Sequence, residues 1–167
     1  MMKNRYYPTL LHKHGFKQKY NIDNSNISEI SYYKLLSMLE KKKSFHLVIG
    51  GDWCPNCIAF YPILDEYAKE KNISVYSLNP RSGFKQKRKT DIRFCKTKDA
   101  EIKMQKLTSL LCLDLPLNVN NTYKLRVPTY IVIKDGTSNG YWSKEYFQWE
   151  INEDLKNSIK KELKELE

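Results

Sequence analysis

The sequence has little of what marks non-globular proteins. Its four cysteines are too few for a disulfide-stabilised scaffold, and its six glycines and six prolines exclude a collagen-like or low-complexity chain. No apolar run approaches the roughly 18–20 residues that a membrane-spanning helix requires. With 167 residues, the chain is long enough for one globular domain that buries its own core without disulfides or a metal.

The N-terminal segment lacks the apolar stretch of a secretory signal peptide. Residues 1–19 are basic, and the pair Leu10-Leu11 is followed at once by polar residues. Residues 1–26 show no clear period, which predicts an extension ahead of the domain. We therefore expect a cytoplasmic protein with reduced thiols and no transmembrane segment.

Acidic residues are scarce relative to basic ones. Lys and Arg total 29 against 19 Asp and Glu, a formal charge of +10 that raises a nucleic-acid or acidic-membrane hypothesis. Eight of the basic residues lie within 81–98, where Asp91 is the one acid. No nucleic-acid motif accompanies them, so we expect no nucleic-acid partner. The segment predicts a solvated surface, with steering of an acidic substrate as the alternative.

Apolar periodicity alternates between strand and helix along the chain. Strands are predicted at 26–30, 45–49, 73–78, 129–133 and 141–147. Helices are predicted at 31–43, 55–71, 101–113 and 151–166. This order favours a layered α/β domain that ends in a hairpin and a helix.

Two of the cysteines, Cys54 and Cys57, are separated by two residues where a predicted strand passes into a helix. Cys54 falls at the helix N-terminus, where unpaired N–H groups and the helix dipole favour an anion. Its thiol pKa should therefore lie below the free value of about 8.5. Cys57, one turn into the helix, should be less exposed and within reach of a disulfide with Cys54. Pro55 suits the first helical position, where its missing N–H has no partner.

A zinc half-site is the alternative interpretation of this pair. Zinc needs about four ligands, but Cys95 and Cys112 are not closely spaced and the histidines show no ligand spacing, so we expect no metal. Cys112 lies between leucines and is predicted to be a small core residue. Cys95 is predicted to be an inert thiol, with a thiol acidified by the basic segment, acting as a regulatory thiol or an extra resolving cysteine, as the alternative.

Three separated motifs have the order and placement of a known family. Trp53-Cys54-Pro55-Asn56-Cys57 matches a Trp-Cys-x-x-Cys active site, and Pro62 matches the kink proline of the helix that follows it. Val127-Pro128-Thr129 and Lys134-Asp135-Gly136 match a cis-proline loop and its following hairpin. On these residues the chain resembles the thioredoxin-like superfamily over about residues 27–167.

The resemblance implies a thioredoxin fold, with a central mixed sheet flanked by helices and an insert at about 81–123 before the cis-proline loop. It implies a thiol–disulfide oxidoreductase, acting on protein or peptide disulfides, whose redox disulfide is Cys54–Cys57 and which needs no other cofactor. A reductase or thiol donor would restore the thiols, and we expect a monomer. Reduction of disulfides is the direction expected in the cytoplasm.

The same resemblance assigns residue roles. Cys54 would attack the substrate disulfide, and Cys57 would resolve the mixed disulfide. Trp53 and Val127 would contact the substrate, and Pro128, in cis, would lie against the sulfurs. The remaining active-site support would come from Pro55, Asn56 and Pro62.

Two departures from the thioredoxin pattern matter. Val48 stands where thioredoxins carry a buried aspartate, and Ser77 stands where its companion lysine is found. Without that pair Cys57 lacks an evident base, because Asp52 is predicted to be a surface or helix-capping acid. The alternative function is therefore a thioredoxin-fold accessory or adaptor protein that acts mainly by binding a partner.

Overall fold

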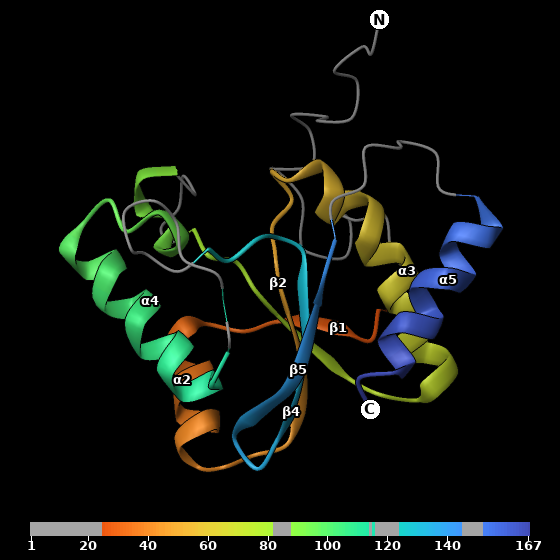
Figure 1. Ribbon diagram of the computed structural model, residues 1–167, viewed down its shortest axis with the longest axis horizontal. Helices are drawn as coiled ribbons and strands as arrows, with labels where there is room; N and C mark the ends of the chain where they lie inside the picture. Colours follow the sequence, from red (N-terminus) through yellow and green to blue (C-terminus); the bar gives the residue numbers. More distant parts are fainter. Residues whose placement is uncertain (1–24, 82–87, 114, 116–123, 145–151) are drawn as a thin grey trace, which may run out of the picture.

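The structure, a computed structural model, describes residues 25–81, 88–113, 115, 124–144 and 152–167 (Figure 1). Its strands are β1 (Ile27–Glu29), β2 (Phe45–Ile49), β3 (Val75–Leu78), β4 (Thr129–Lys134) and β5 (Thr137–Ser143). Its helices are α2 (Tyr32–Glu40), α3 (Pro55–Lys71), α4 (Lys98–Leu111) and α5 (Glu153–Lys164), with short 3₁₀ helices η2 (Arg88–Thr90) and η3 (Ile92–Phe94). Most of the predicted N-terminal extension and much of the predicted insert lie outside these residues.

The five strands form one mixed sheet in the order β1-β3-β2-β4-β5. β1 and β2 run parallel to β3, whereas β4 runs antiparallel to both β2 and β5. The register places Val48 of β2 between Ser77 of β3 and Tyr130 of β4. The predicted α/β fold with a mixed sheet is confirmed, and the strand order is consistent with a thioredoxin-like topology.

In the part of the chain that the structure describes, helices lie on both faces of the sheet (Figure 1). α2 and α4 pack together on one face, and α3 and α5 pack together on the other. Leu47, Val48 and Ile49 of β2 are fully buried, which is typical of a central strand covered on both faces. Phe60 of α3 stacks on Trp142 of β5 with ring centroids 4.5 Å apart, so α3 is held firmly against the sheet.

Capping residues decide where the helices begin and end. Ser31 caps α2, as predicted, and Thr97 caps α4, which therefore starts at Lys98, ahead of the predicted position. α4 ends at Leu111 because Cys112 adopts a left-handed φ of 52°. Cys112 is exposed at this helix end, so its prediction as a core residue is wrong.

The hairpin between β4 and β5 is tighter than predicted. Asp135 and Gly136 both have positive φ, 51° and 79°, the two-residue geometry whose twist matches paired strands. β5 therefore begins at Thr137, opposite Lys134, earlier than the predicted start at residue 141. Among the described residues, no helix is long and apolar enough to pass through a bilayer.

Candidate active site

The Cys54–Cys57 pair lies where β2 passes into α3. The turn after β2 is closed by a backbone hydrogen bond of 3.1 Å from Cys54 N–H to the Gly51 carbonyl. Cys54 is the N-cap of α3, with extended φ and ψ of −106° and 119°, and its sulfur accepts the Cys57 N–H at 3.4 Å. Pro55 stands in the first turn of the helix, where its missing N–H costs no hydrogen bond. The structure thus brings the pair to a helix start, as the sequence predicts.

The two thiols are unequal. Cys54 is 7% exposed and Cys57 is 0% exposed, and both are free. The hydrogen bond with the Cys57 side chain lowers the pKa of Cys54 to about 7, against burial, and backbone hydrogen bonds from Cys57 and Asn56 add to the lowering. Burial, followed by the hydrogen bond with Cys54, raises the pKa of Cys57 well above its ordinary value. At neutral pH, Cys54 is therefore the thiol that supplies the thiolate.

A loop distant in sequence reaches Cys54. The Val127–Pro128 peptide bond is cis, and the Val127 carbonyl oxygen accepts the Cys54 thiol hydrogen at an S···O distance of 3.7 Å. The Ser143 hydroxyl donates to the Pro128 carbonyl at 3.0 Å, which fastens the loop to β5. Val127 and Pro128 are both buried. The fold thus brings two of the sequence motifs into contact at one sulfur.

Neutral hydroxyl groups lie behind Cys57, where the resemblance leads us to look for an acid and a lysine. Val48 and Ser77 are register partners and are 0% and 4% exposed. The Ser77 and Tyr61 hydroxyls are hydrogen-bonded at 2.6 Å. Gly50 leaves room for this arrangement, because a Cβ there would meet the Cys57 sulfur at 2.9 Å and the Tyr61 hydroxyl at 3.1 Å. These uncharged neighbours do not counter the raised pKa of Cys57.

Trp53, next to Cys54, lies against two arginines of the basic segment. The Cζ atoms of Arg81 and Arg93 are 3.6 and 4.9 Å from the ring centroid, which is cation–π distance. Asp91 is fully buried and forms ion pairs with both, at 3.3 Å to Arg81 and 2.7 Å to Arg93. The charge of Arg93 also contributes to the low pKa of Cys54, although less than the hydrogen bonds do. We call Arg81, Asp91 and Arg93 the Arg–Asp–Arg cluster.

The sequence interpretation missed this cluster, since it treated the basic segment as solvated surface. Asp91 itself could have indicated the cluster, because a single acid among eight basic residues can form ion pairs with several of them. The burial of Asp91 is accompanied by ion pairs with two arginines, which only the fold brings to it. A second acid, Asp52, was predicted to be a surface or helix-capping acid, but it is 3% exposed and the N-cap of α3 is Cys54.

Pro62, Cys95 and the possible metal ligands are the other site candidates that the sequence suggested. Pro62 lies inside α3, where a kink proline was expected. Burial, and then the charge of Glu101, raises the pKa of Cys95, so the acidified-thiol alternative for Cys95 is wrong. Within the described ranges, no three His, Cys, Asp or Glu side chains group as a metal site.

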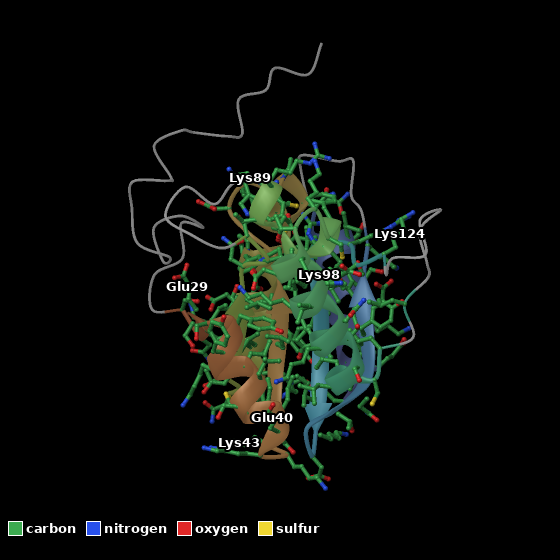
Figure 2. All side chains as sticks on the ribbon, turned by 90° about the vertical axis from the view of Figure 1, so that its left-hand side faces the viewer. Glu29, Glu40, Lys43, Lys89, Lys98 and Lys124 are labelled. Atoms are coloured by element: carbon green, nitrogen blue, oxygen red, sulfur yellow. The ribbon has the colours of Figure 1, made fainter. Side chains whose placement is uncertain are left out.

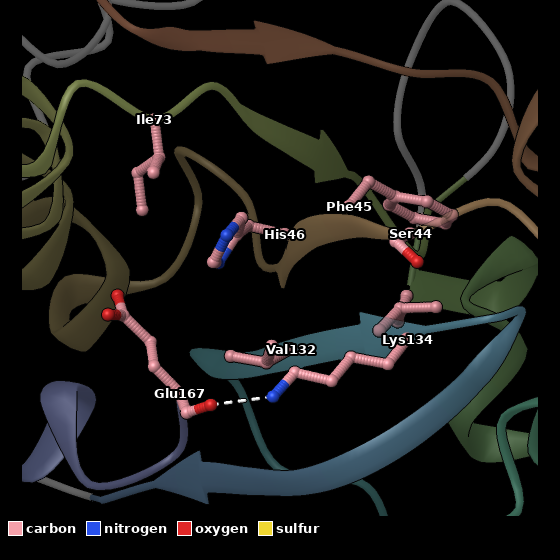
Figure 3. A pocket seen from close by; sticks show the side chains of 8 residues that line it. Ser44, Phe45, His46, Ile73, Val132, Lys134 and Glu167 are labelled. Atoms are coloured by element: carbon pink, nitrogen blue, oxygen red, sulfur yellow. Dashed lines mark hydrogen bonds between the residues drawn. The ribbon is translucent and has the colours of Figure 1, made fainter.

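A cavity of about 310 Å³ opens at the other end of the sheet (Figure 3). It is lined by the start of β2 and the end of β4, whereas Cys54 follows the end of β2. Lys134 Nζ donates to the Glu167 carbonyl oxygen at 2.6 Å beside it. His46 Nδ1 is hydrogen-bonded to the Tyr130 hydroxyl at 2.7 Å, and burial lowers the pKa of His46. This cavity is separate from the cysteine pair.

Compared with protein-family models and with curated protein sequences, the chain matches none. What the structure shows is an α/β fold with a mixed five-stranded sheet and a CxxC pair at a helix start. This pair and the groups around it therefore define the chemistry that the site can perform.

Proposed function

We propose that the chain is a thioredoxin-like thiol–disulfide oxidoreductase that reduces disulfides of proteins or peptides through Cys54 and Cys57. The observation that carries this proposal is the unequal pair, an N-cap thiol with a pKa of about 7 beside a fully buried thiol with a raised pKa. The contact of Val127 with Cys54 supports it. In this proposal, residues 27–167 form one thioredoxin-like domain with an insert at about 81–123.

The first step is attack by Cys54. Its thiolate bonds to one sulfur of the substrate disulfide while the substrate S–S bond breaks, and the departing sulfur leaves as a thiolate that takes up a proton. With a pKa of about 7, about half of Cys54 is thiolate at pH 7, against about 3% for an ordinary thiol. The hydrogen bond from the Cys57 backbone N–H stabilises this anion before the attack.

The second step is resolution by Cys57. Cys57 gives up its proton and bonds to the Cys54 sulfur, the mixed disulfide breaks, and the second substrate sulfur leaves and takes that proton. The substrate is reduced by two electrons and the cysteine pair is oxidised by two. A reductase or a small dithiol then restores the pair. Direct transfer of the proton to the departing sulfur suits a site in which Val48 and Ser77 replace the acid and lysine.

Substrate binding would use the groups beside Cys54. Trp53 would form part of the docking surface, and the backbone at Val127 and Pro128 would pair with an extended substrate segment. The helix start that holds the nucleophile would be supported by Pro55, Asn56 and Pro62. These roles are the ones that the resemblance to thioredoxin-like proteins implies, and the contact of the Val127 carbonyl with the Cys54 sulfur supports the role of Val127.

Reduction of insulin disulfides driven by dithiothreitol tests the activity. We expect turnover by the wild type, loss of turnover in Cys54→Ser, and a trapped mixed disulfide in Cys57→Ser, because the trapped species lacks its resolving thiol. Equal turnover by the wild type and Cys54→Ser would refute the proposal. Equilibration of the Cys54–Cys57 disulfide with glutathione would give its reduction potential, which separates a reductant from an oxidant.

The replaced acid–lysine pair favours a second candidate, an adaptor that keeps the fold but works by contact. In that case Cys54→Ala/Cys57→Ala would bind its protein partner as well as the wild type does. Loss of partner capture in this double variant would count against the adaptor and for the redox function.

A further inference from the structure

The side chain of Trp53 is held as a platform beside the nucleophile. Trp53 Nε1 donates to the Asn79 side-chain oxygen at 3.2 Å, and the backbone N–H of Arg81 donates to the same oxygen at 3.0 Å. The guanidinium of Arg81 then stacks over the indole ring at 3.6 Å. Asn79 thus fixes both partners of the stack, and Cys54 follows Trp53 directly in the chain.

The Arg–Asp–Arg cluster carries more positive than negative charge. Arg93 binds Asp91 through two parallel hydrogen bonds, Nε to Oδ1 at 2.9 Å and Nη2 to Oδ2 at 2.7 Å. Arg81 reaches the same carboxylate through Nε alone, at 3.3 Å. Two guanidinium groups on one carboxylate leave the cluster itself with a net charge of one positive unit.

Arg81 is the member of the cluster that can still bind an anion. Arg81 binds Asp91 through Nε, and its terminal Nη atoms donate to no acceptor among the described residues. Arg93, in contrast, is bound to Asp91 in a two-point contact. The Arg81 side chain is 18% exposed, so part of it reaches solvent while its stack on Trp53 fixes its position. A guanidinium held in place loses little conformational freedom when it binds a carboxylate.

Exposed lysines add positive charge at the end of the molecule where Trp53 and the Arg–Asp–Arg cluster lie. Figure 2 shows Lys89 and Lys124 toward the end of the molecule where β2 ends and α3 begins, whereas Glu40 and Lys43 lie at the opposite end. Lys89 and Lys124 are exposed. An anionic substrate would therefore be attracted toward the cluster over a range of roughly 8–10 Å at moderate ionic strength.

We propose that Arg81, held by Asp91 and stacked on Trp53, binds the carboxylate of an acidic residue beside the substrate cysteine. The substrate class is then a peptide or protein disulfide flanked by Asp or Glu. One extended residue spans about 3.3–3.6 Å, so an acidic residue within one or two positions of the cysteine can reach a group adjacent to Trp53. This inference rests on the proposed function, because it names the substrates of the same thiol.

Two disulfide peptides that differ only in Glu or Gln beside each cysteine test the preference. We expect the wild type to reduce the Glu peptide with a kcat/KM about tenfold above that for the Gln peptide, since charge-assisted hydrogen bonds are roughly twice as strong as neutral ones. The preference should shrink as salt is added. Equal rates for the two peptides would overturn the inference and leave the proposed function standing.

Two variants assign the preference to Arg81. In Arg81→Gln the preference should fall to within about twofold, and Arg81→Lys should keep part of it, because lysine keeps the charge but not the planar fork. Lys98→Gln is the matched control: it removes the same charge from an exposed side chain paired with Glu101, and should keep the full preference. Loss of preference in Lys98→Gln as large as in Arg81→Gln would show that overall charge, and not this site, is responsible.

A binding measurement separates failure of docking from failure of the chemistry. Calorimetric titration of the wild type with Glu and Gln peptides that carry serine in place of cysteine measures docking alone. If neither disulfide peptide is reduced, the proposed function fails, and tighter binding of the Glu peptide would still support the carboxylate site. Equal binding of both serine peptides would overturn the inference.

Discussion

Cys57→Ala removes the side chain that contributes most to the low pKa of the Cys54 thiol. A hydrogen bond to a charged group contributes about 1.5–3 kcal/mol, and about 1.4 kcal/mol corresponds to one pKa unit, so its loss should raise the pKa by about one to two units. A rise from about 7 to about 8 lowers the thiolate fraction at pH 7 from about one half to about one tenth. Alkylation of Cys54 at pH 7 should therefore slow at least about fivefold.

The rate of alkylation by iodoacetamide, followed across the pH range, measures this pKa. The background should be Cys95→Ser/Cys112→Ser, because Cys112 is exposed and would react as well. The sign follows from the chemistry: a lowered thiol pKa means that reactivity persists as the pH falls toward 7 and is lost below it. We expect a wild-type midpoint near pH 7 and a Cys57→Ala midpoint at about pH 8 or above.

Cys57→Ser is the matched control, since serine keeps a hydroxyl donor at nearly the same volume. Its midpoint should stay within about half a unit of the wild-type value. Equal midpoints in the alanine and serine variants would refute the account, because the side-chain hydrogen bond would then contribute nothing. So would a wild-type midpoint near the ordinary thiol value of about 8.5.

Two further predictions concern packing around the site. Gly50→Ala would place a methyl group 2.9 Å from the Cys57 sulfur, and such overpacking should lower the free energy of unfolding by about 1–3 kcal/mol in urea denaturation. An unchanged unfolding midpoint would contradict that close approach. Asp91→Asn removes the charge that two arginines share in a fully buried position, and should destabilise the fold by about 3 kcal/mol in thermal denaturation. Asp99→Asn, which removes an exposed carboxylate paired with Lys103, should change the free energy of unfolding by less than about 1 kcal/mol. Equal losses of stability in the Asp91 and Asp99 variants would argue against a special role for Asp91.

Local patterns predicted the elements well where a short-range cause sets them. The short run Phe45–Ile49, apolar except for His46, predicted the bounds of β2 correctly because a central strand is buried on both faces. Pro55 marked the start of α3 for a similarly local reason. The prediction failed for Cys112, because the leucines on either side suggested a helix that in fact ends one residue before it.

The sequence by itself determined the α/β alternation and the pairing of Cys54 with Cys57 at a helix start, since these depend on periodicity, capping and spacing over a few residues. Only the tertiary structure decided which groups surround the sulfurs. The Val127 carbonyl contacts Cys54 because β4, which follows Val127, pairs with β2, which precedes Cys54. The scarcity of cysteines and acids in the composition does not predict that contact. Likewise, the ion pairs of Asp91 with Arg81 and Arg93, and the stacking of Arg81 on Trp53, exist only in the folded chain. Burial and charge pairing depend on distances in space, which cannot be read from the order of residues in the sequence.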